Sequence, residues 1–237
     1  MRGRPGLTHP LVAFLTASVL LHFAYPLTLR GQVWEILYVL LYPAVVLLGV
    51  RVVRAEGHRL VPVAVLSAVF LAAGFWAALH PEVPTARLWL FCAVVLFQGY
   101  LILKLLVFVF TYRQRHRGET GPQLIMAAIC AYLLLGGVFA ALFGIVEALW
   151  PGAFEDSLAP GTAVDWQDLT YLSFVTLVTL GYGDLVPLTP WARSLATAEA
   201  VAGTLFLTTV IARIVGAYVS VTESGGSGTG AETDGSA

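Results

Sequence analysis

The chain has 237 residues, of which 58% are hydrophobic and only 11% charged, a composition typical of membrane proteins and poorly suited to water. Lys and Arg number 13 against 14 Asp and Glu, for a net charge of −1. This balance provides no basic field to hold a nucleic acid, so that class of partner is excluded. Two cysteines, Cys92 and Cys130, lie within apolar runs and are expected to be packing thiols.

Six apolar runs are long enough to cross a hydrocarbon core, which takes about 20 helical residues. They occupy residues 11–29, 33–50, 60–79, 88–110, 124–150 and 191–219. A seventh run, residues 166–178, is too short to cross and precedes a glycine-rich stretch, so it is predicted to enter the membrane and return. The predicted fold is an all-α membrane protein of six transmembrane helices, with a re-entrant helix and loop between helices five and six.

Basic residues orient this bundle. One side carries Arg2, Arg4, Arg51, Arg54, Arg59, Arg113, Arg115 and Arg117, and the other carries Arg30, Arg87 and Arg193. The richer side is expected to be cytoplasmic and to hold both termini. A cleaved signal peptide is the alternative for the first run, but His22 and the poor small-residue exit after Ala24 argue against it.

The stretch after the short run is Thr176-Leu-Val-Thr179-Leu180-Gly181-Tyr182-Gly183-Asp184. Backbone carbonyls can replace the water shell of an ion only if they face a common axis, which requires successive residues to alternate in handedness. Gly181 and Gly183 permit this, while the side chains of Leu180 and Tyr182 would point away from the axis. We refer to residues 179–183 as the motif loop. Because one strand supplies only one wall of a cage, four copies of the chain are expected around the axis.

The same stretch resembles the potassium-channel signature Thr-x-x-Thr-Val-Gly-Tyr-Gly-Asp, with Leu180 in place of the usual Val or Ile. It follows a half-span and lies between two full spans, which is the context that the motif needs. The resemblance is to the potassium-channel pore-domain family, and in particular to small bacterial six-helix channel-like proteins. It implies a homotetrameric, potassium-selective channel of a bacterial inner membrane, with membrane lipids and K⁺ as partners. The implied ion ligands are Thr179, Leu180, Gly181, Tyr182 and Gly183, with K⁺ held at the first four.

The resemblance also implies supports around the motif loop. Tyr171 could hold Asp184, whereas Leu172 replaces a second aromatic partner of Tyr182, so the filter is expected to be less rigid and more prone to inactivation. Glu147 would tie the outer helix to backbone behind the filter; snorkelling to water is the alternative. The filter-supporting residues are thus Asp184, Tyr171, Thr176 and Glu147.

In the last run, Gly203 matches the glycine at which related inner helices bend to gate. The residues expected to line the inner vestibule are Thr204, Leu207, Thr208, Ile211 and Val215, although the two threonines could instead bond to their own helix. Glu199 and Arg213 are possible gating charges, since a charge within a span is a functional candidate. They are too far apart along one helix to pair, and Arg213 is expected to face a neighbouring helix or the inner headgroups.

The chain is predicted to divide at residues 118–123, where Gly118, Gly121 and Pro122 interrupt the apolar pattern. The predicted parts are a four-helix transmembrane domain at 1–117; a pore domain at 118–220, with outer helix 124–150, pore helix 166–178, filter 179–183 and inner helix 191–219; and a disordered cytoplasmic tail at 221–237. The tail is assigned by its Gly, Ser, Thr and acidic composition, which has too little apolar surface to fold.

The front four helices lack the pattern of a voltage sensor, which needs several Arg or Lys at every third position of one helix. The fourth run contains only Lys104, and Arg113, Arg115 and Arg117 lie beyond it at a spacing of two. Weak or absent voltage dependence is therefore predicted.

Between Trp150 and Thr189 the chain has no Lys or Arg but several acids: Glu155, Asp156, Asp165, Asp168 and Asp184. Fourfold symmetry would multiply them into a mouth that concentrates cations, the alternative being an ordinary solvated loop. Catalysis and cofactors are not expected, because no nucleophile–base set, phosphate loop or metal spacing occurs. Two rival functions remain: a weakly selective cation channel, and a non-conducting regulatory membrane subunit with a vestigial motif.

Overall fold

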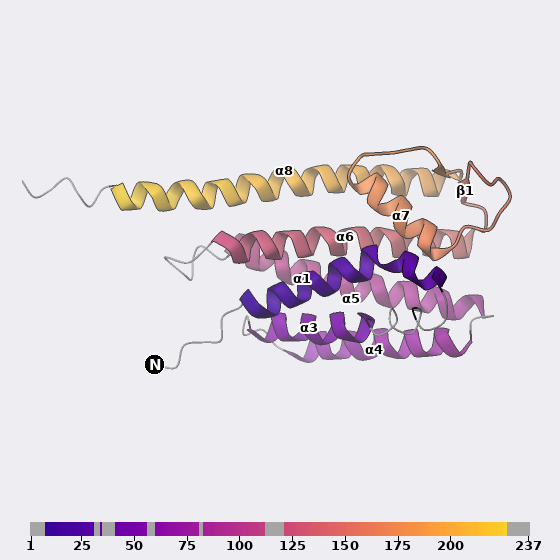
Figure 1. Ribbon diagram of the computed structural model, residues 1–237, viewed down its shortest axis with the longest axis horizontal. Coiled ribbons are helices and arrows are strands. Elements are labelled where there is room, and N and C mark those ends of the chain that lie inside the picture. Colours follow the sequence, from indigo (N-terminus) through magenta and orange to yellow (C-terminus); the bar gives the residue numbers. More distant parts are fainter. Residues whose placement is uncertain are drawn as a thin grey trace, which may run out of the picture.

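The computed structural model describes residues 8–30, 34, 41–55, 60–80, 83–111 and 121–226. These form a mostly helical bundle whose long members lie side by side (Figure 1). The elements are α1 (Thr8–Phe23), the 3₁₀ helix η1 (Tyr25–Arg30), α3 (Leu41–Ala55), α4 (Leu60–Leu79), α5 (Pro84–Thr111), α6 (Gly121–Leu149), β1 (Phe154–Asp156), α7 (Trp166–Leu177), β2 (Leu185–Pro187) and α8 (Pro190–Gly226).

Four described helices, α4, α5, α6 and α8, are long and apolar enough to cross a membrane, and two shorter apolar helices occur in α1 and α3. The first predicted run divides in two: α1 ends at Phe23 and a 3₁₀ helix begins at Tyr25. Pro26 explains this break, since proline removes a backbone donor and disfavours helix at the preceding residue. Much of the second predicted run lies outside the described residues, so a count of six complete spans stays a prediction.

The helices of the back half fall close to their predicted places, apart from the end of the last one. Continuing past the predicted end at residue 219, α8 reaches Gly226. Residues 221–226, which were predicted to be disordered, are therefore helical. Extending an existing helix adds one hydrogen bond for each residue fixed, so a composition of small polar residues does not by itself end it. The rest of the predicted tail, residues 227–237, lies outside the described residues, as does the first half of the predicted domain boundary, residues 118–120.

A small antiparallel sheet departs from the all-α prediction. Phe154 pairs with Pro187 and Asp156 with Leu185, which joins the loop after α6 to the loop after the motif. Each strand has only three residues, too few for an alternating pattern to stand out in the sequence.

Packing brings the predicted pore elements together at one end of the bundle. α6 packs against α5 and α1 on one side, and the short α7 packs against α6 and α8. β1 and the loops lie at that end, while the start of α1 and the end of α8 lie at the other (Figure 1). A cluster at the loop end, formed by Phe143, Ala153, Phe154, Leu169, Leu172, Leu185 and Ala192, holds the sheet against α6, α7 and α8.

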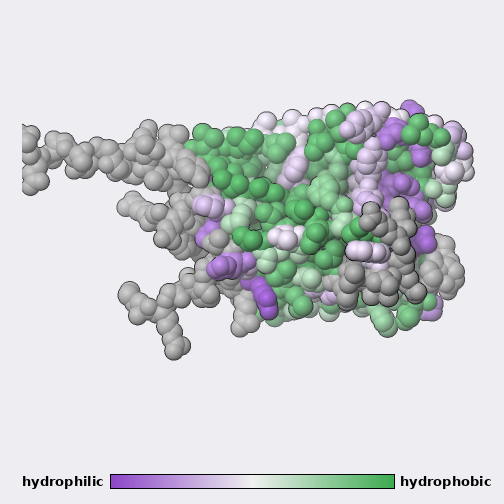
Figure 2. All heavy atoms as spheres, in the orientation of Figure 1, coloured by the Kyte–Doolittle hydropathy of each residue, from purple (hydrophilic) through white to green (hydrophobic). Residues whose placement is uncertain are grey.

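The surface agrees with a multi-pass membrane protein. On the face shown in Figure 2, apolar residues cover the length of the helices and hydrophilic residues gather toward the two ends. Apolar surface of this extent on a helical bundle is typical of contact with lipid or with other chains.

Candidate functional site

The site begins with α7, whose first turn is held by two acids. The backbone N–H of Asp165 donates to Oδ2 of Asp168 at 2.9 Å, and a carboxylate in the first turn interacts favourably with the positive end of the helix. Both acids therefore have a local structural role beside the predicted one of attracting cations. At its other end, α7 closes with a bond from Val178 N–H to the carbonyl of Phe174 at 3.2 Å, and the motif loop begins there.

The backbone of the motif loop alternates in handedness. Thr179, Gly181 and Gly183 have φ angles of +58°, +55° and +80°, and the residues between them do not have positive φ. The two glycines adopt this region readily. Thr179 does not, since a non-glycine residue there is strained, and such strain concentrates at functional sites. Sequence reasoning anticipated the glycines but gave no signal for Thr179.

Hydrogen bonds fix the start of this loop to α7 and α6. Thr179 N–H donates to the carbonyl of Thr176 at 2.9 Å, and Leu180 N–H donates to that of Val175 at 2.9 Å. From α6, the hydroxyl of Tyr132 donates to the carbonyl of Leu177 at 3.2 Å. Tyr132 is a supporting residue that the sequence analysis missed, because nothing near it in the chain marks it.

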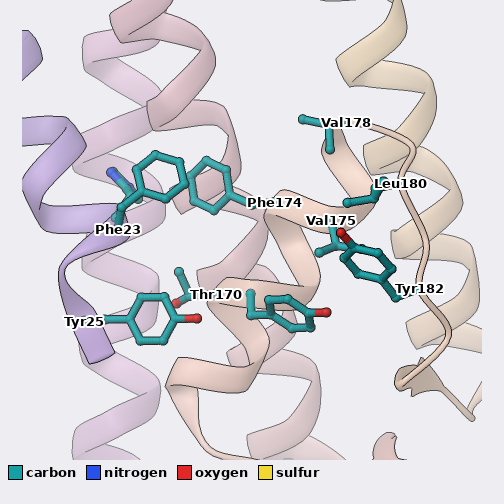
Figure 3. Close-up of a pocket in the computed structure, with 10 residues that line it drawn as sticks. Phe23, Tyr25, Thr170, Phe174, Val175, Val178, Leu180 and Tyr182 are labelled. Carbon is teal, nitrogen blue, oxygen red and sulfur yellow. The ribbon is translucent and has the colours of Figure 1, made fainter. Parts of the chain in front are cut away.

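The side chains of Leu180 and Tyr182 point from the loop toward α7, where Val175 lies beside them (Figure 3). They line an open hollow of about 320 Å³ together with α7 and the end of α1. In the single chain they remain 53% and 68% exposed. A carbonyl-lined path would require the opposite side of the loop to be left to its backbone.

Asp184, directly after the loop, is held from two directions. The hydroxyl of Tyr171 donates to its Oδ2 at 2.7 Å, the pairing that the resemblance implied, and Leu185 N–H donates to its Oδ1 at 3.0 Å. The bond from Tyr171 lowers the pKa of Asp184 below its ordinary value, because it favours the ionised carboxylate. Leu172 is buried in the loop-end cluster, so it packs behind the site without bonding to Tyr182.

Glu147 bonds to the loop that follows its own helix. Its Oε1 accepts from Gly152 N–H at 2.7 Å and its Oε2 from Phe154 N–H at 3.2 Å. Phe154 begins β1, and the partner strand β2 starts directly after Asp184. The carboxylate thus braces the backbone beside the motif loop through the sheet.

Gly203 on α8 is buried against the end of α7. A Cβ at this position would collide with the carbonyl oxygen of Leu177, so close packing alone requires a glycine. The helix is continuous through Gly203, and its role as a hinge stays a prediction. Packing against α7 is a second reason for this glycine that the sequence did not reveal.

The predicted vestibule residues all lie on α8 with exposed side chains in the single chain; they are Thr204, Leu207, Thr208, Ile211 and Val215. The hydroxyl of Thr204 donates to the carbonyl of Ala200 at 2.9 Å, and that of Thr208 to the carbonyl of Thr204 at 2.9 Å. The alternative that they bond to their own helix therefore holds in this structure. Each hydroxyl oxygen can still accept a hydrogen bond, because its lone pairs are free when it donates.

The two predicted gating charges have separate surroundings. Arg213 donates from its guanidinium to the carbonyl of Phe110 at 3.0 Å, and so lies against the C-terminal end of α5, where carbonyls carry negative partial charge. Glu199 is 0% exposed and bonds to Ser173 on α7. Among the described residues no group of three or more His, Cys, Asp or Glu could hold a metal ion.

Comparisons with known proteins agree with this geometry. Residues 127–220 match a family model described as an ion channel. The chain is also 31% identical over 90 residues to the inward rectifier potassium channel Kirbac3.1 of Paramagnetospirillum magnetotacticum; this alignment covers 36% of this chain and 26% of that protein. The chain thus matches about a quarter of that relative's length. No solved structure matches it.

The matched residues include α7, the motif loop and most of α6 and α8. They confirm the resemblance to the potassium-channel pore family that the motif indicated. Residues 127–220 are thus similar in sequence to an ion-channel family and to part of a potassium channel.

Proposed function

We propose that the protein is a homotetrameric, potassium-selective channel that conducts K⁺ passively, without a cofactor, along the backbone of the motif loop. The observation that carries this proposal is the alternation of φ, which is positive at Thr179, Gly181 and Gly183. The side chains of the residues between them, Leu180 and Tyr182, point toward α7 (Figure 3). Such a strand presents its carbonyls to one side, and four strands would enclose a dehydrated cation.

The surroundings of the loop favour a cation. α7 ends at the motif loop, and the C-terminal end of a helix carries a negative partial charge. Asp184 is ionised at neutral pH, because the ordinary pKa of 3.8 already lies well below neutrality and the bond from Tyr171 lowers it further. Four copies of each would raise the local concentration of cations at the entrance.

The proposal extends to the helices around the motif loop and to the topology of the chain. We place α6, α7 and α8 as the outer, re-entrant and inner helices of the pore, with a hinge at Gly203 and the exposed residues of α8 from Thr204 to Val215 along the inner vestibule. Six spans in a bacterial inner membrane, both termini in the cytoplasm and weak voltage dependence complete the proposal. The start of α1 and the end of α8 lie at the same end of the bundle (Figure 1), which favours this topology.

A weakly selective cation channel is the second candidate, favoured by the absence of an aromatic partner for Tyr182 at Leu172. Selective filters hold their carbonyls at defined positions, and Tyr182 is 68% exposed in the single chain. Reversal potentials in mixed Na⁺ and K⁺ solutions distinguish the two. A non-conducting regulatory subunit predicts no flux at all.

The test is a K⁺ flux assay on the protein reconstituted in liposomes, with Gly181→Ala as the dead variant. No atom lies within 4 Å of a Cβ at Gly181, so alanine acts there by opposing the positive φ. Gly161→Ala is the matched control, because Gly161 has a φ of +80° in the loop before α7 and also has open space. We expect flux in the wild type and in the control and none in Gly181→Ala. Equal flux in all three proteins, or none in the wild type, would contradict the proposal.

A further inference from the structure

Glu199 is a fully buried acid with no basic partner among the described residues. It lies on α8 and is 0% exposed. Its Oε1 is within hydrogen-bond distance of the Ser173 hydroxyl on α7, while its Oε2 has no partner. An ionised carboxylate in this setting would be a buried, uncompensated charge, which is strongly destabilising.

The hydrogen count at Ser173 shows how this cost is avoided. The Ser173 hydroxyl also lies 2.7 Å from the carbonyl of Gly136 on α6. A hydroxyl has one hydrogen to donate, and a carbonyl can only accept. When Ser173 donates to Gly136, its contact with Glu199 is a hydrogen bond only if Glu199 carries a proton and donates it to Ser173 Oγ.

We infer that Glu199 is held as the neutral acid and is a positioning residue for the motif loop, acting through the relay Glu199 to Ser173 to Gly136. The relay joins α8, α7 and α6 by directed bonds, one residue from each helix. This inference rests on the proposed function, since it assigns Glu199 a part in placing the carbonyls that the ion meets.

The path from the relay to the loop is short. Ser173 lies two residues before Val175, whose carbonyl accepts from Leu180 N–H. One turn along α8 from Glu199, Gly203 packs on the carbonyl of Leu177. Removing the relay would free α7 to shift against α6 and α8, and the motif loop is bonded directly to α7.

The relay predicts a loss of flux at alkaline pH, where Glu199 gives up its proton and the bond to Ser173 is lost. Tyr132 on α6 is a titratable group within electrostatic reach of Glu199, and α7 contributes the uncharged Ser173 on this face. From α1, His22 lies beside Gly137, next to the relay's Gly136; histidine ordinarily titrates at about pH 6.5, about 2 or more units below the alkaline range. Tyrosine also ionises in the alkaline range, near pH about 10. An alkaline limb that survives Tyr132→Phe and disappears in Glu199→Gln therefore belongs to Glu199.

The experiment compares four variants of the full chain in liposomes. Glu199→Ala should lower K⁺ flux about tenfold, the effect expected when a buried hydrogen-bonded partner is lost. Glu199→Gln should rescue that flux, because its amide N–H can donate to Ser173 as the neutral acid does. Ser173→Ala should behave like Glu199→Ala. Ser67→Ala is the matched control, since Ser67 is a buried serine that bonds to Val63 of its own helix, and its flux should match the wild type.

Infrared spectroscopy gives a readout that does not depend on conduction. The wild type should show the carbonyl band of a protonated carboxylic acid, which is lost in Glu199→Gln and shifted in Ser173→Ala. If the wild type carries no flux, the proposed function fails while this band still tests the relay. A wild type without the band, or a folded Glu199→Gln as impaired as Glu199→Ala, would overturn the inference.

Discussion

The front helices, α1 and α3 to α5, differ from the back elements, α6 to α8, in the side-chain hydrogen bonds that join one back element to another. Side-chain hydrogen bonds within one helix occur in both regions, as from Ser67 to Val63 in the front and from Thr204 to Ala200 in the back. In the back, Tyr132 bonds from α6 to α7 and Ser173 bonds from α7 to both α6 and α8.

This difference follows from what each region must do. The front packs by apolar shape, for example through Phe70 stacked on Phe97 with centroids 5.4 Å apart, and such packing tolerates conservative change. Directed hydrogen bonds fix an orientation, and their loss leaves buried polar atoms unpaired. Single substitutions should therefore cost most in the back, close to the motif loop.

The largest effect is expected from a glycine-to-alanine substitution at Gly203 on α8, with the same substitution at Gly216 of that helix as its control. Gly203→Ala should reduce stability by about 1–3 kcal/mol through overpacking and abolish K⁺ flux, because the Leu177 carbonyl that it meets cannot move without α7. Gly216→Ala meets no atom within 4 Å and should be neutral or gain up to about 1 kcal/mol from helix propensity. Thermal unfolding in detergent and liposome flux measure both. If the two variants had equal effects on stability and flux, the contact between Gly203 and Leu177 would not be the cause.

Glu147→Ala comes next, because it leaves two backbone N–H groups without their acceptor. We expect the free energy of unfolding to fall by about 1–3 kcal/mol and the loop around β1 to become more sensitive to protease. Glu155→Ala, a change of the same kind within β1, is the control and should have a smaller effect. If both variants behave alike, the bonds from Glu147 to Gly152 and Phe154 contribute little.

A smaller and pH-dependent effect is expected from Tyr171→Phe. The Tyr171 bond lowers the pKa of Asp184, so its stabilisation is fully present above the ordinary value of 3.8 and is lost as the pH falls through the lowered folded value. The wild type should thus unfold at a higher temperature than Tyr171→Phe at neutral pH, and the gap should close in strong acid. A gap that stays constant with pH would show that Asp184 is not the group involved.

The smallest effect is expected in the front region, where the voltage response should be weak. Arg113, Arg115 and Arg117 lie outside the described residues, and their spacing of two does not form a stripe along one helix face. Neutralising them one at a time should leave the slope of the conductance–voltage curve unchanged. A steep wild-type curve that flattens in these variants would instead give the front helices a sensing role.

Elements that depend only on neighbouring residues in the chain could be predicted from the sequence. The run at residues 60–79 became α4 (Leu60–Leu79), because a run of this length that is apolar apart from Ser67 has few alternatives in a membrane. Gly181 and Gly183 carry the positive φ expected of them, since glycine alone adopts it without strain. The break at Pro26 was equally local, but the length of the apolar run concealed it.

Contacts between distant segments could not be predicted in this way. Ser173 and Glu199 are 26 positions apart, and Tyr132 and Leu177 are 45 apart. Neither pair forms a pattern, because any buried serine or tyrosine can find a partner on several helices. Glu199 attracted notice only as a charge within a span, and the neutral state that we infer for it rests on the contacts of Ser173 with Glu199 and Gly136.

The amino-acid sequence by itself determined that the chain enters a membrane and where a glycine-rich loop can turn its backbone, because hydrophobicity and φ preference belong to individual residues. Only the tertiary structure decided which side chains brace that loop, why Gly203 must be small and how a buried acid is tolerated behind α7. Those outcomes depend on the distances between helices that are far apart in the chain, which packing sets and no single segment encodes.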